Sequence, residues 1–368
     1  MMRWIFVMMM FLFVCMLVFP DNGQAKPSTS ADQAILMEQS SGRVLYEKDA
    51  NQQRPIASIT KIMTAMIAIE SGKMDETVTV SKRAAYAEGS SIYLEQGEKI
   101  KLKDLVYGLI LRSGNDAAVA IAEHVGGSVE GFSYLMNEKA SWLGMTNSHF
   151  DNPHGLDSKT HYSTAYDMAL LMRYAMNNSE FREITGTTTY KADTKEYAWR
   201  NKNKLLTSYY DYCIGGKTGF TKVAGRTLVS AARKDDMELI AVTLNDPDDW
   251  QDHIGMYDWA FDKYHMTSVL DKGEKTYQLK NSNQTATGYV PHDVLYPLDA
   301  HEQEHIGMKT YLLKQPLQAS QEQIGKTVIY LDQKPLGEVS VLNRKRQASK
   351  DTLLTDTISV LKQMVGLD

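Results

Sequence analysis

Strand-like segments stand at both ends of a long helical block, and this order limits the folds that the chain can adopt. Residues 34–37 and 44–46 have the apolar runs and the separating turn of a β-hairpin. Three further strand-like segments, residues 212–220, 227–232 and 239–244, follow the block. Strands bury their apolar faces only against other elements, so we expect both groups to join in one antiparallel sheet that the helices cover. The predicted fold class is α+β.

Apolar residues at helical spacing predict the helices of the block. One helix begins near Ser58 and ends at Gly72, and a second begins at Asp104, its expected N-cap. The second helix breaks at residues 113–115, because Ser, Gly and Asn favour a turn. The remaining helices are predicted over residues 117–125, 133–143, 165–176 and 256–264.

The N-terminus has the layout of a secretory signal peptide. Arg3 precedes an uncharged apolar run over residues 4–19, and Gly23-Gln24-Ala25 suits cleavage after Ala25. The alternative is an uncleaved membrane anchor, although the run is slightly short to span a bilayer. In both cases we expect the rest of the chain outside the cytoplasm. Cleavage leaves Cys213 as the only cysteine, which excludes an intramolecular disulfide and favours a small buried side chain at that position.

From about Val269 the composition changes to short alternating segments with polar turns, which predict a small all-β domain. Its clearest strands are residues 276–279, 309–313, 327–331 and 336–342. The last segment, residues 351–368, has the apolar stripe of an amphipathic helix. The expected division is a signal peptide over 1–25, a main domain over 26–268, the β domain over 269–345 and the amphipathic helix over 346–368.

Three short motifs in one order carry the candidate chemistry: Ser58-Ile59-Thr60-Lys61, Ser113-Gly114-Asn115 and Lys217-Thr218-Gly219. They supply a serine nucleophile, two lysines that can activate it, a second hydroxyl, an amide and a threonine, which suit acyl transfer through a serine ester. Ser58 and Lys61 share one face of a helix start, where the helix dipole favours charge on the serine oxygen. A desolvated lysine acts as a base once its pKa falls. In isolation, a helix-capping serine beside a solvated lysine remains an alternative.

Three other kinds of site are disfavoured. Gly216-Lys217-Thr218 ends like a phosphate loop, but that pattern requires glycine where Asp211 stands, and a strand follows. A Ser-His-Asp triad lacks its G-x-S-x-G turn, so we expect the following four residues to stabilise a loop: His149, Asp151, His154 and Asp157. Zinc-ligand spacing is missing, and we expect neither a metal nor a cofactor. A net charge of −5 without a large basic block argues against a nucleic-acid partner.

The chain resembles the serine-type D-alanyl-D-alanine carboxypeptidases of peptidase family S11, which are low-molecular-mass penicillin-binding proteins. The similarity spans roughly residues 34–264 and includes the longer strings at residues 54–61, 113–117, 152–157 and 217–221. It implies a penicillin-binding-protein and β-lactamase-like transpeptidase fold, with an antiparallel sheet flanked by helices. A small C-terminal all-β domain and a terminal amphipathic helix follow in such proteins.

The resemblance also implies catalytic roles. Ser58 would attack the carbonyl between the two terminal D-alanines of a peptidoglycan stem peptide, and Lys61 would accept its proton. Ser113 with Lys217 would relay a proton to the leaving D-alanine, and water would release the shortened peptide. Penicillin and other β-lactams would inhibit by acylating Ser58, because the strained amide resembles the dipeptide.

The implied substrate-binding residues are Asn115, Thr218, Gly219 and Phe220. Asn115 would bind the substrate amide, and backbone N–H groups of Ser58 and Phe220 would form an oxyanion hole. Thr218 would bind the terminal carboxylate. Several relatives add an arginine after the strand that follows K-T-G, but the corresponding residues 245–252 are acidic and contain none. Carboxylate recognition is therefore expected to rest on Thr218 and Lys217, with Arg226 as a further candidate.

Two other functions remain open at this point. A β-lactamase is disfavoured because no E-x-x-L-N string lies between Asn115 and Lys217. A non-catalytic domain that binds cell-wall peptide is disfavoured because all catalytic positions are filled. For the terminal helix we expect peripheral attachment to the outer face of the cytoplasmic membrane, with packing against the β domain as the alternative.

Overall fold

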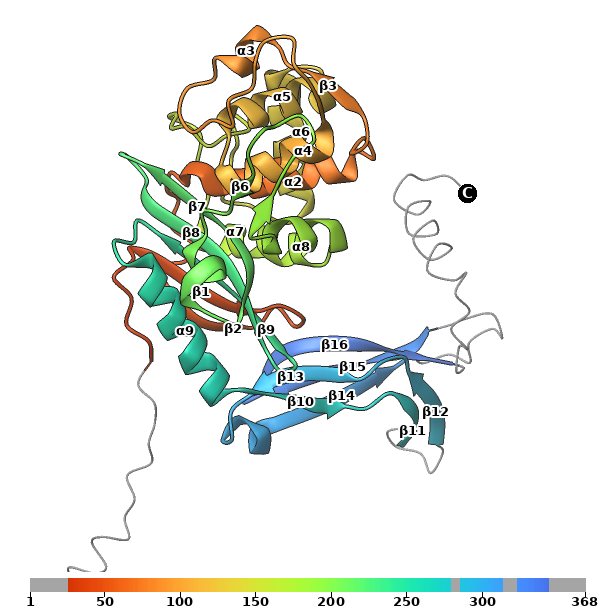
Figure 1. Ribbon diagram of the computed structural model, residues 1–368. Coiled ribbons are helices and arrows are strands. Elements are labelled where there is room, and N and C mark those ends of the chain that lie inside the picture. The colour runs from red at the N-terminus through yellow and green to blue at the C-terminus, as the bar shows by residue number, and fades with distance from the viewer. Residues whose placement is uncertain (1–25, 279–284, 314–322, 344–368) are drawn as a thin grey trace, which may run out of the picture. The chain divides into compact units, whose positions relative to one another are not determined.

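In the computed structural model, the early hairpin and the three late strands form one sheet, as predicted. The sheet has five antiparallel strands in the order β2-β1-β9-β8-β7 (Figure 1). Every residue of β1 is buried, because β1 pairs with β2 on one side and with β9 on the other. β7 lies at an edge and therefore leaves one side of its backbone unpaired. The strands are β1 (Gln33–Glu38), β2 (Val44–Lys48), β7 (Cys213–Thr221), β8 (Gly225–Lys234) and β9 (Met237–Leu244).

The structure describes residues 26–278, 285–313 and 323–343, in two compact units, Met1–Lys263 and Tyr264–Asp368. The predicted signal peptide and C-terminal helix lie outside the described residues. Of the helices in the described ranges, none is long and apolar enough to cross a membrane.

The helical block between β2 and β7 contains most of the predicted helices. Two small hairpins within the block, helices α3 and α8, and the helical turn η3 were not predicted. They are too short to show a clear period in the sequence. The hairpins are β3 (Thr77–Thr79) with β4 (Lys99–Lys101) and β5 (Thr189–Tyr190) with β6 (Trp199–Arg200). The helices and helical turns are η1 (Ala57–Thr60), α2 (Lys61–Glu70), α3 (Lys82–Ala85), α4 (Leu102–Tyr107), η2 (Gly108–Arg112), α5 (Asn115–Gly126), α6 (Val129–Trp142), α7 (Ala165–Met176), α8 (Ser179–Gly186) and η3 (Leu205–Tyr209).

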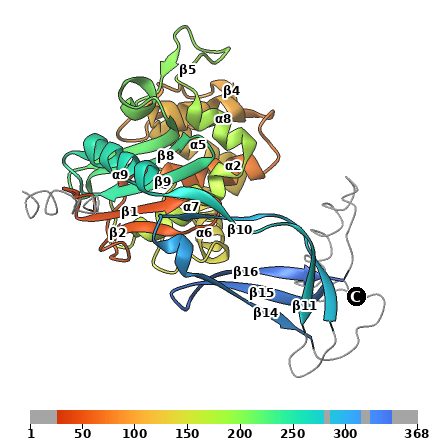
Figure 2. The same ribbon diagram turned by 90° about the horizontal axis from the view of Figure 1, so that it is seen from below.

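Alternation along β8 assigns the two faces of the sheet to different helices. Val229 and Ala231 belong to the apolar core of the helical block. Ser230 points the other way and bonds through Oγ to Nδ1 of His253, at 2.7 Å, on α9 (Asp249–Lys263). Figure 2 shows α9 lying along β8 and β9. Side chains of the edge strand β7 therefore alternate between the helical block and the α9 side.

Two predicted helix starts are wrong. Asp104 is not an N-cap: α4 begins at Leu102 after Lys101, and the buried Asp104 carboxylate in its first turn accepts a bond from the Tyr190 hydroxyl. The last helix of this unit begins at Asp249 rather than at Met256. Aspartates in its first turn favour the positive end of the helix dipole, a signal that apolar spacing does not reveal.

The second unit is a β structure, with strands where the sequence predicted them. Three more strands, β10, β12 and β13, were not predicted. The unit has a five-stranded antiparallel sheet in the order β11-β12-β16-β15-β14 and a pair β10-β13. Its elements are β10 (His265–Leu270), β11 (Gly273–Gln278), β12 (Thr285–Val290), β13 (Val294–Leu298), η4 (Glu302–His305), β14 (Ile306–Leu312), β15 (Gln323–Leu331) and β16 (Lys334–Leu342).

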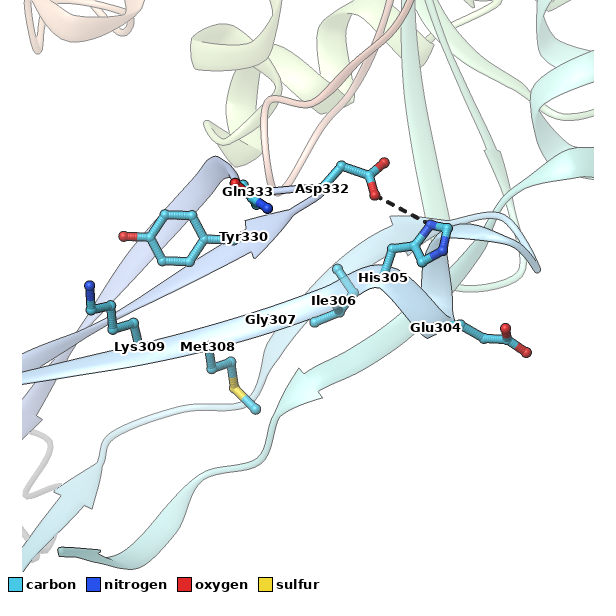
Figure 3. A pocket seen from close by; sticks show the side chains of 9 residues that line it. All are labelled: Glu304, His305, Ile306, Gly307, Met308, Lys309, Tyr330, Asp332 and Gln333. Atoms are coloured by element: carbon cyan, nitrogen blue, oxygen red, sulfur yellow. Dashed lines mark ion pairs between the residues drawn. The ribbon is translucent and has the colours of Figure 1, made fainter.

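A surface hollow lies in this unit where β14 begins beside the turn between β15 and β16 (Figure 3). Its one ion pair joins Nδ1 of His305 to Oδ1 of Asp332 at 3.3 Å, and both side chains are more than half exposed. Exposed groups are not desolvated, so this hollow lacks the main cause of perturbed reactivity at catalytic sites.

Candidate active site

Ser58 lies in the helical turn η1, immediately before α2, and Lys61 is the first residue of α2. Lys61 Nζ donates to Ser58 Oγ at 2.9 Å. The Ser58 side chain does not cap the helix, since η1 has Ile56 at its N-cap without a side-chain bond. Lys61 is fully buried. The alternative of a capping serine beside a solvated lysine is therefore wrong.

The Lys61 ammonium has three acceptors. Besides Ser58, it donates to Oδ1 of Asn115 at 2.8 Å and to the backbone carbonyl of His154 at 2.6 Å. Burial, followed by the charge of Lys217, holds the Lys61 pKa well below its usual value. Deprotonation then leaves a lone pair beside a serine hydroxyl, which is the arrangement of a general base and its nucleophile.

The loop around His154 fixes the nucleophile from the other side. Ala57 has φ +48°, and a Cβ on Gly155 would lie 1.9 Å from the Ala57 carbonyl oxygen. Only glycine fits at that approach. The hydroxyl of Thr64 donates to the Pro153 carbonyl at 2.6 Å. This loop is one of the strings that carry the family resemblance, and its sequence alone gives no sign of this positioning role.

Other residues of this loop stabilise it, as predicted. Asp151 accepts bonds from Ser158 and Thr160. His161 connects the loop to η1, because its ring bonds to Thr60 Oγ1 at 2.8 Å and accepts from the Asp151 amide at 3.1 Å. Burial lowers the pKa of His154 to about 3. A neutral imidazole is therefore expected at neutral pH.

Ser113 ends η2 in a left-handed conformation, with φ +64°. The next helix, α5, begins with Asn115, whose amide is bonded at both ends within the protein: Oδ1 accepts from Lys61, and Nδ2 donates to the Glu88 carbonyl at 2.5 Å. Asn115 is 4% exposed. The structure thus gives this amide a role in holding Lys61, and its predicted contact with substrate stays a prediction.

The buried Asp116 carboxylate secures a neighbouring loop. It accepts bonds from the Ser91 hydroxyl at 2.6 Å and from the Ile92 and Leu94 amides at 3.0 and 3.1 Å. The Ser90 carbonyl also accepts from the backbone N–H of Asn115 at 2.6 Å. These bonds bring Ser90 to the site. The sequence marked Asp116 only as part of a longer string and gave no sign of its partners.

Lys217 reaches the site from β7. It pairs with Val229, which faces the helical block, so the Lys217 side chain lies on the same face as η1 and α2. It is buried, its ammonium donates to the Thr218 carbonyl at 2.6 Å, and burial followed by the charge of Lys202 lowers its pKa to about 7. Such a group exchanges protons readily at neutral pH.

The glycines of this strand serve close packing. A Cβ on Gly219 would lie 2.4 Å from Thr227 Oγ1 and 2.8 Å from the Ser58 amide nitrogen, so η1 presses against β7. Gly215 and Gly216 have φ +157° and +149°. Their added Cβ atoms would lie 2.4 Å from Thr185 Cγ2 and from the Val229 carbonyl oxygen. These two glycines therefore allow β7 to pack closely against Thr185 and β8.

A cleft of about 520 Å³ opens over Ser58 and brings five other predicted residues to its wall. Lys61, Lys217 and Asn115 lie behind this wall, buried. Lys202 and Ser90 also line the cleft, although no motif in the sequence marks them. The full lining is Ser58, Ser90, Ser113, Lys202, Thr218, Gly219, Phe220, Arg226, Asp249 and Trp250.

Arg226 enters the cleft from β8 beside the K-T-G strand, in register with Phe220. Its Nη2 forms an ion pair with Oδ1 of the nearly buried Asp249, and its guanidinium carbon lies 5.6 Å from the centre of the Trp250 ring. The acidic stretch that lacks an arginine thus holds one from another strand. No local pattern predicts a contact between residues so far apart in the chain.

Cys213 is buried, and burial raises its pKa to about 11. A thiol with a raised pKa is a poor nucleophile. The prediction of a small buried side chain at this position is confirmed.

Comparisons with known proteins agree with this site. A family model for D-alanyl-D-alanine carboxypeptidase matches residues 21–248. The D-alanyl-D-alanine carboxypeptidase DacF of Bacillus subtilis is 33% identical over 354 residues, covering 91% of this chain and 89% of the relative. DacC of Escherichia coli, another D-alanyl-D-alanine carboxypeptidase, is 38% identical over 246 residues, covering 64% and 61%.

Penicillin binding protein 5 of Haemophilus influenzae has a solved structure that matches with a TM-score of 0.75 and 28% identity, covering 87% of this chain and 98% of that chain. The predicted resemblance and fold class are confirmed. The chain belongs to peptidase family S11, the serine-type D-alanyl-D-alanine carboxypeptidases.

Proposed function

We propose that this D-alanyl-D-alanine carboxypeptidase trims peptidoglycan stem peptides through an acyl-enzyme on Ser58. The observation that carries the proposal is the 2.9 Å contact between Ser58 Oγ and the buried Lys61 Nζ, whose pKa burial depresses. A neutral lysine amine at that distance is positioned to remove the hydroxyl proton as the oxygen attacks.

In acylation, Ser58 Oγ forms a bond to the carbonyl carbon of the penultimate D-alanine, and its proton passes to Lys61 Nζ. The stabilisation of the oxyanion is assigned to the backbone N–H groups of Ser58 and Phe220. When the C–N bond breaks, Ser113 gives a proton to the leaving amine nitrogen and Lys217 resupplies Ser113. The proton that Lys61 took up then replaces the one that Lys217 has lost, so Lys61 is again neutral before deacylation. Terminal D-alanine departs.

In deacylation, a water molecule gives a proton to Lys61 and attacks the ester carbonyl. The C–O bond to Ser58 breaks, Ser58 regains its proton, and the shortened peptide leaves. A β-lactam offers a strained amide to the same Ser58, so we expect penicillin to acylate and inhibit the enzyme.

Recognition of the terminal carboxylate is assigned to Thr218, Lys217 and Arg226. Arg226 is the diagonal neighbour of Thr218 across β7 and β8, so both side chains lie on one face of the sheet. Asp249 and Trp250 hold the guanidinium beside the leaving-group side of the cleft. This arrangement would replace the arginine that several relatives carry after the next strand.

An enzyme of this activity works where peptidoglycan matures, outside the cytoplasm. The predicted signal peptide over residues 1–25 fits that location. Attachment of the predicted helix over residues 346–368 to the outer face of the membrane is proposed on the sequence alone. The main domain, proposed over residues 26–268, contains all of the assigned catalytic groups.

The test uses the mature chain from residue 26 onward, as the native protein and as Ser58→Ala. Labelled penicillin should attach to the native protein only, and D-alanine should be released from a diacyl-Lys-D-Ala-D-Ala peptide. Ser58→Ala should lose both signals while its melting temperature stays within a few degrees. Labelling that survives the substitution rules out Ser58 as the nucleophile, and fast release of penicilloate would indicate a β-lactamase instead.

A further inference from the structure

Lys202 is a third lysine at the active-site cleft, in addition to the two buried catalytic lysines. It follows β6, and its backbone amide donates to the Leu111 carbonyl at 3.1 Å, close in sequence to Ser113. Its ammonium donates to Ser90 Oγ at 3.3 Å, and its side chain lines the cleft together with Ser58. Two independent anchors therefore hold its charge at the cleft wall.

No carboxylate neutralises Lys202 within the residues that the structure describes, where its ammonium has only the Ser90 hydroxyl as a bonding partner. Arg112, a cation whose charge acts on Lys202, donates to the Arg200 carbonyl at 3.2 Å and adds positive charge. Burial followed by the charge of Arg112 lowers the Lys202 pKa. Even with this lowering, the ammonium is expected to stay charged at neutral pH, because the unperturbed pKa of a lysine side chain is about 10.4.

The groups that face the buried pair Lys61 and Lys217 are mostly cationic or neutral. The imidazoles on the loop side, His154 and His161, have pKa values lowered to about 3 and 4 and are neutral. The buried carboxylate on α5, Asp116, is the one group that raises the Lys61 pKa, and three N–H donors and one hydroxyl already stabilise its charge.

The far end of the cleft adds little net charge. Arg226 and Asp249 form an ion pair there, so their charges largely cancel at a distance. Among the described residues of the cleft wall, Lys202 is thus a cation without a carboxylate partner, and its charge disfavours the protonated forms of Lys61 and Lys217.

We propose that Lys202 is a positioning residue that acts through its charge on Lys61 and Lys217, and so extends the activity of the enzyme to lower pH. The proposal rests on the Ser58 mechanism, in which a neutral Lys61 is the base. Lys202 needs no contact with substrate for this effect. Its exposed place lets salt screen the effect, which gives a second measurement.

The experiment measures kcat/KM for a diacyl-Lys-D-Ala-D-Ala peptide from pH 5 to 10 with the full mature enzyme. Lys202→Met should move the acidic limb of the kcat/KM profile to higher pH by about half a pH unit, because the buried amines then hold protons more tightly. Lys202→Arg should keep the native limb. Lys204→Met is the matched control, since Lys204 is also exposed but contacts the Tyr209 ring instead of the cleft.

Raising NaCl from 0.05 to 0.5 M should move the native limb toward that of Lys202→Met and leave the variant nearly unchanged. An unmoved limb in Lys202→Met, with or without a lower plateau, overturns the proposal, as does an equal shift in Lys202→Arg. Labelling of Ser58→Ala by penicillin would refute the mechanism itself. A failure of this inference alone leaves Ser58 labelling intact.

Discussion

Two lysines with almost no exposed surface define the chemistry of this site at the residue scale. Lysine is rarely buried without partners. Three acceptors offset part of the desolvation cost of the Lys61 ammonium, and the Thr218 carbonyl does so for Lys217. Desolvation disfavours the charged form of each amine, so burial itself supplies the free base that serine chemistry requires.

Arg226 permits a test of carboxylate recognition. Arg226→Leu should lower kcat/KM for a peptide ending in D-Ala-D-Ala by about tenfold to a hundredfold, the loss expected for a charge-assisted hydrogen bond. The same peptide with an amidated C-terminus should be hydrolysed poorly by the native enzyme and equally poorly by the variant. Steady-state kinetics on the two peptides measure this discrimination.

Arg233→Leu is the control for this substitution, because Arg233 lies on the same strand, exposed and away from the cleft. It should retain native discrimination. If Arg226→Leu still prefers the free carboxylate by the native factor, Thr218 and Lys217 alone recognise it.

At the scale of elements, the site depends on close contacts between backbones. η1 is held between the Pro153–Gly155 loop and β7, with glycine at each approach. These backbone contacts, together with Ile59 in the apolar core, hold the turn containing Ser58 in position. Gly219 and the Asn-Pro-His-Gly loop therefore have a steric role in placing Ser58.

Gly155→Ala tests this arrangement. The new Cβ would lie 1.9 Å from the Ala57 carbonyl oxygen, so η1 must shift and the Ser58–Lys61 contact should be lost. We expect penicillin acylation to slow by at least about a hundredfold, as a displacement near 1 Å does at other active sites. Stopped-flow acylation and thermal unfolding together measure the effect.

Gly144→Ala provides the matched control. Gly144 also has a positive φ, +75°, but a Cβ there meets nothing within 4 Å. Both substitutions thus carry the backbone cost of about 1 kcal/mol, and only one carries the clash. Equal acylation rates in the two variants would contradict the steric role of Gly155.

At the scale of the whole molecule, buried titratable groups couple stability to pH. The pKa values of His154, His161 and His253 are lowered to about 3, 4 and 3 by burial. Below the unfolded-state pKa near 6.5, these histidines bind protons in the unfolded chain but not in the native state. The free energy of unfolding therefore decreases as the pH is lowered. Asp246 opposes this trend below about pH 6, because burial raises its pKa to about 6.

The net effect between pH 6 and 4 is an acid-labile enzyme, with about 1.4 kcal/mol lost per pH unit for each net proton. In His253→Gln, the free energy of unfolding should decrease less steeply as the pH is lowered, because one of the three histidines with a lowered pKa is removed. Urea unfolding at pH 7, 6 and 5 measures the slope. A slope equal to that of the native protein would show that His253 does not titrate on unfolding.

Local periodicity and motif order determined much of this protein from the sequence alone. The hairpin, the helical block and the late strands were predicted because apolar spacing reports which face an element must bury. The three motifs named Ser58, Lys61, Ser113 and Lys217 because serine acyl transfer requires those residue types. Helix starts were predicted poorly, at Asp104 for α4 and at Met256 for α9, since capping depends on a few polar contacts.

Only the tertiary structure decided how distant residues meet. The Asn115 amide holds Lys61, Asp249 holds Arg226 across two elements, and Lys202 brings a third ammonium to the cleft. The glycines before Lys217 allow close packing against Thr185 and β8. Each of these is a non-local contact, and its energy depends on burial and distance that a linear pattern does not contain.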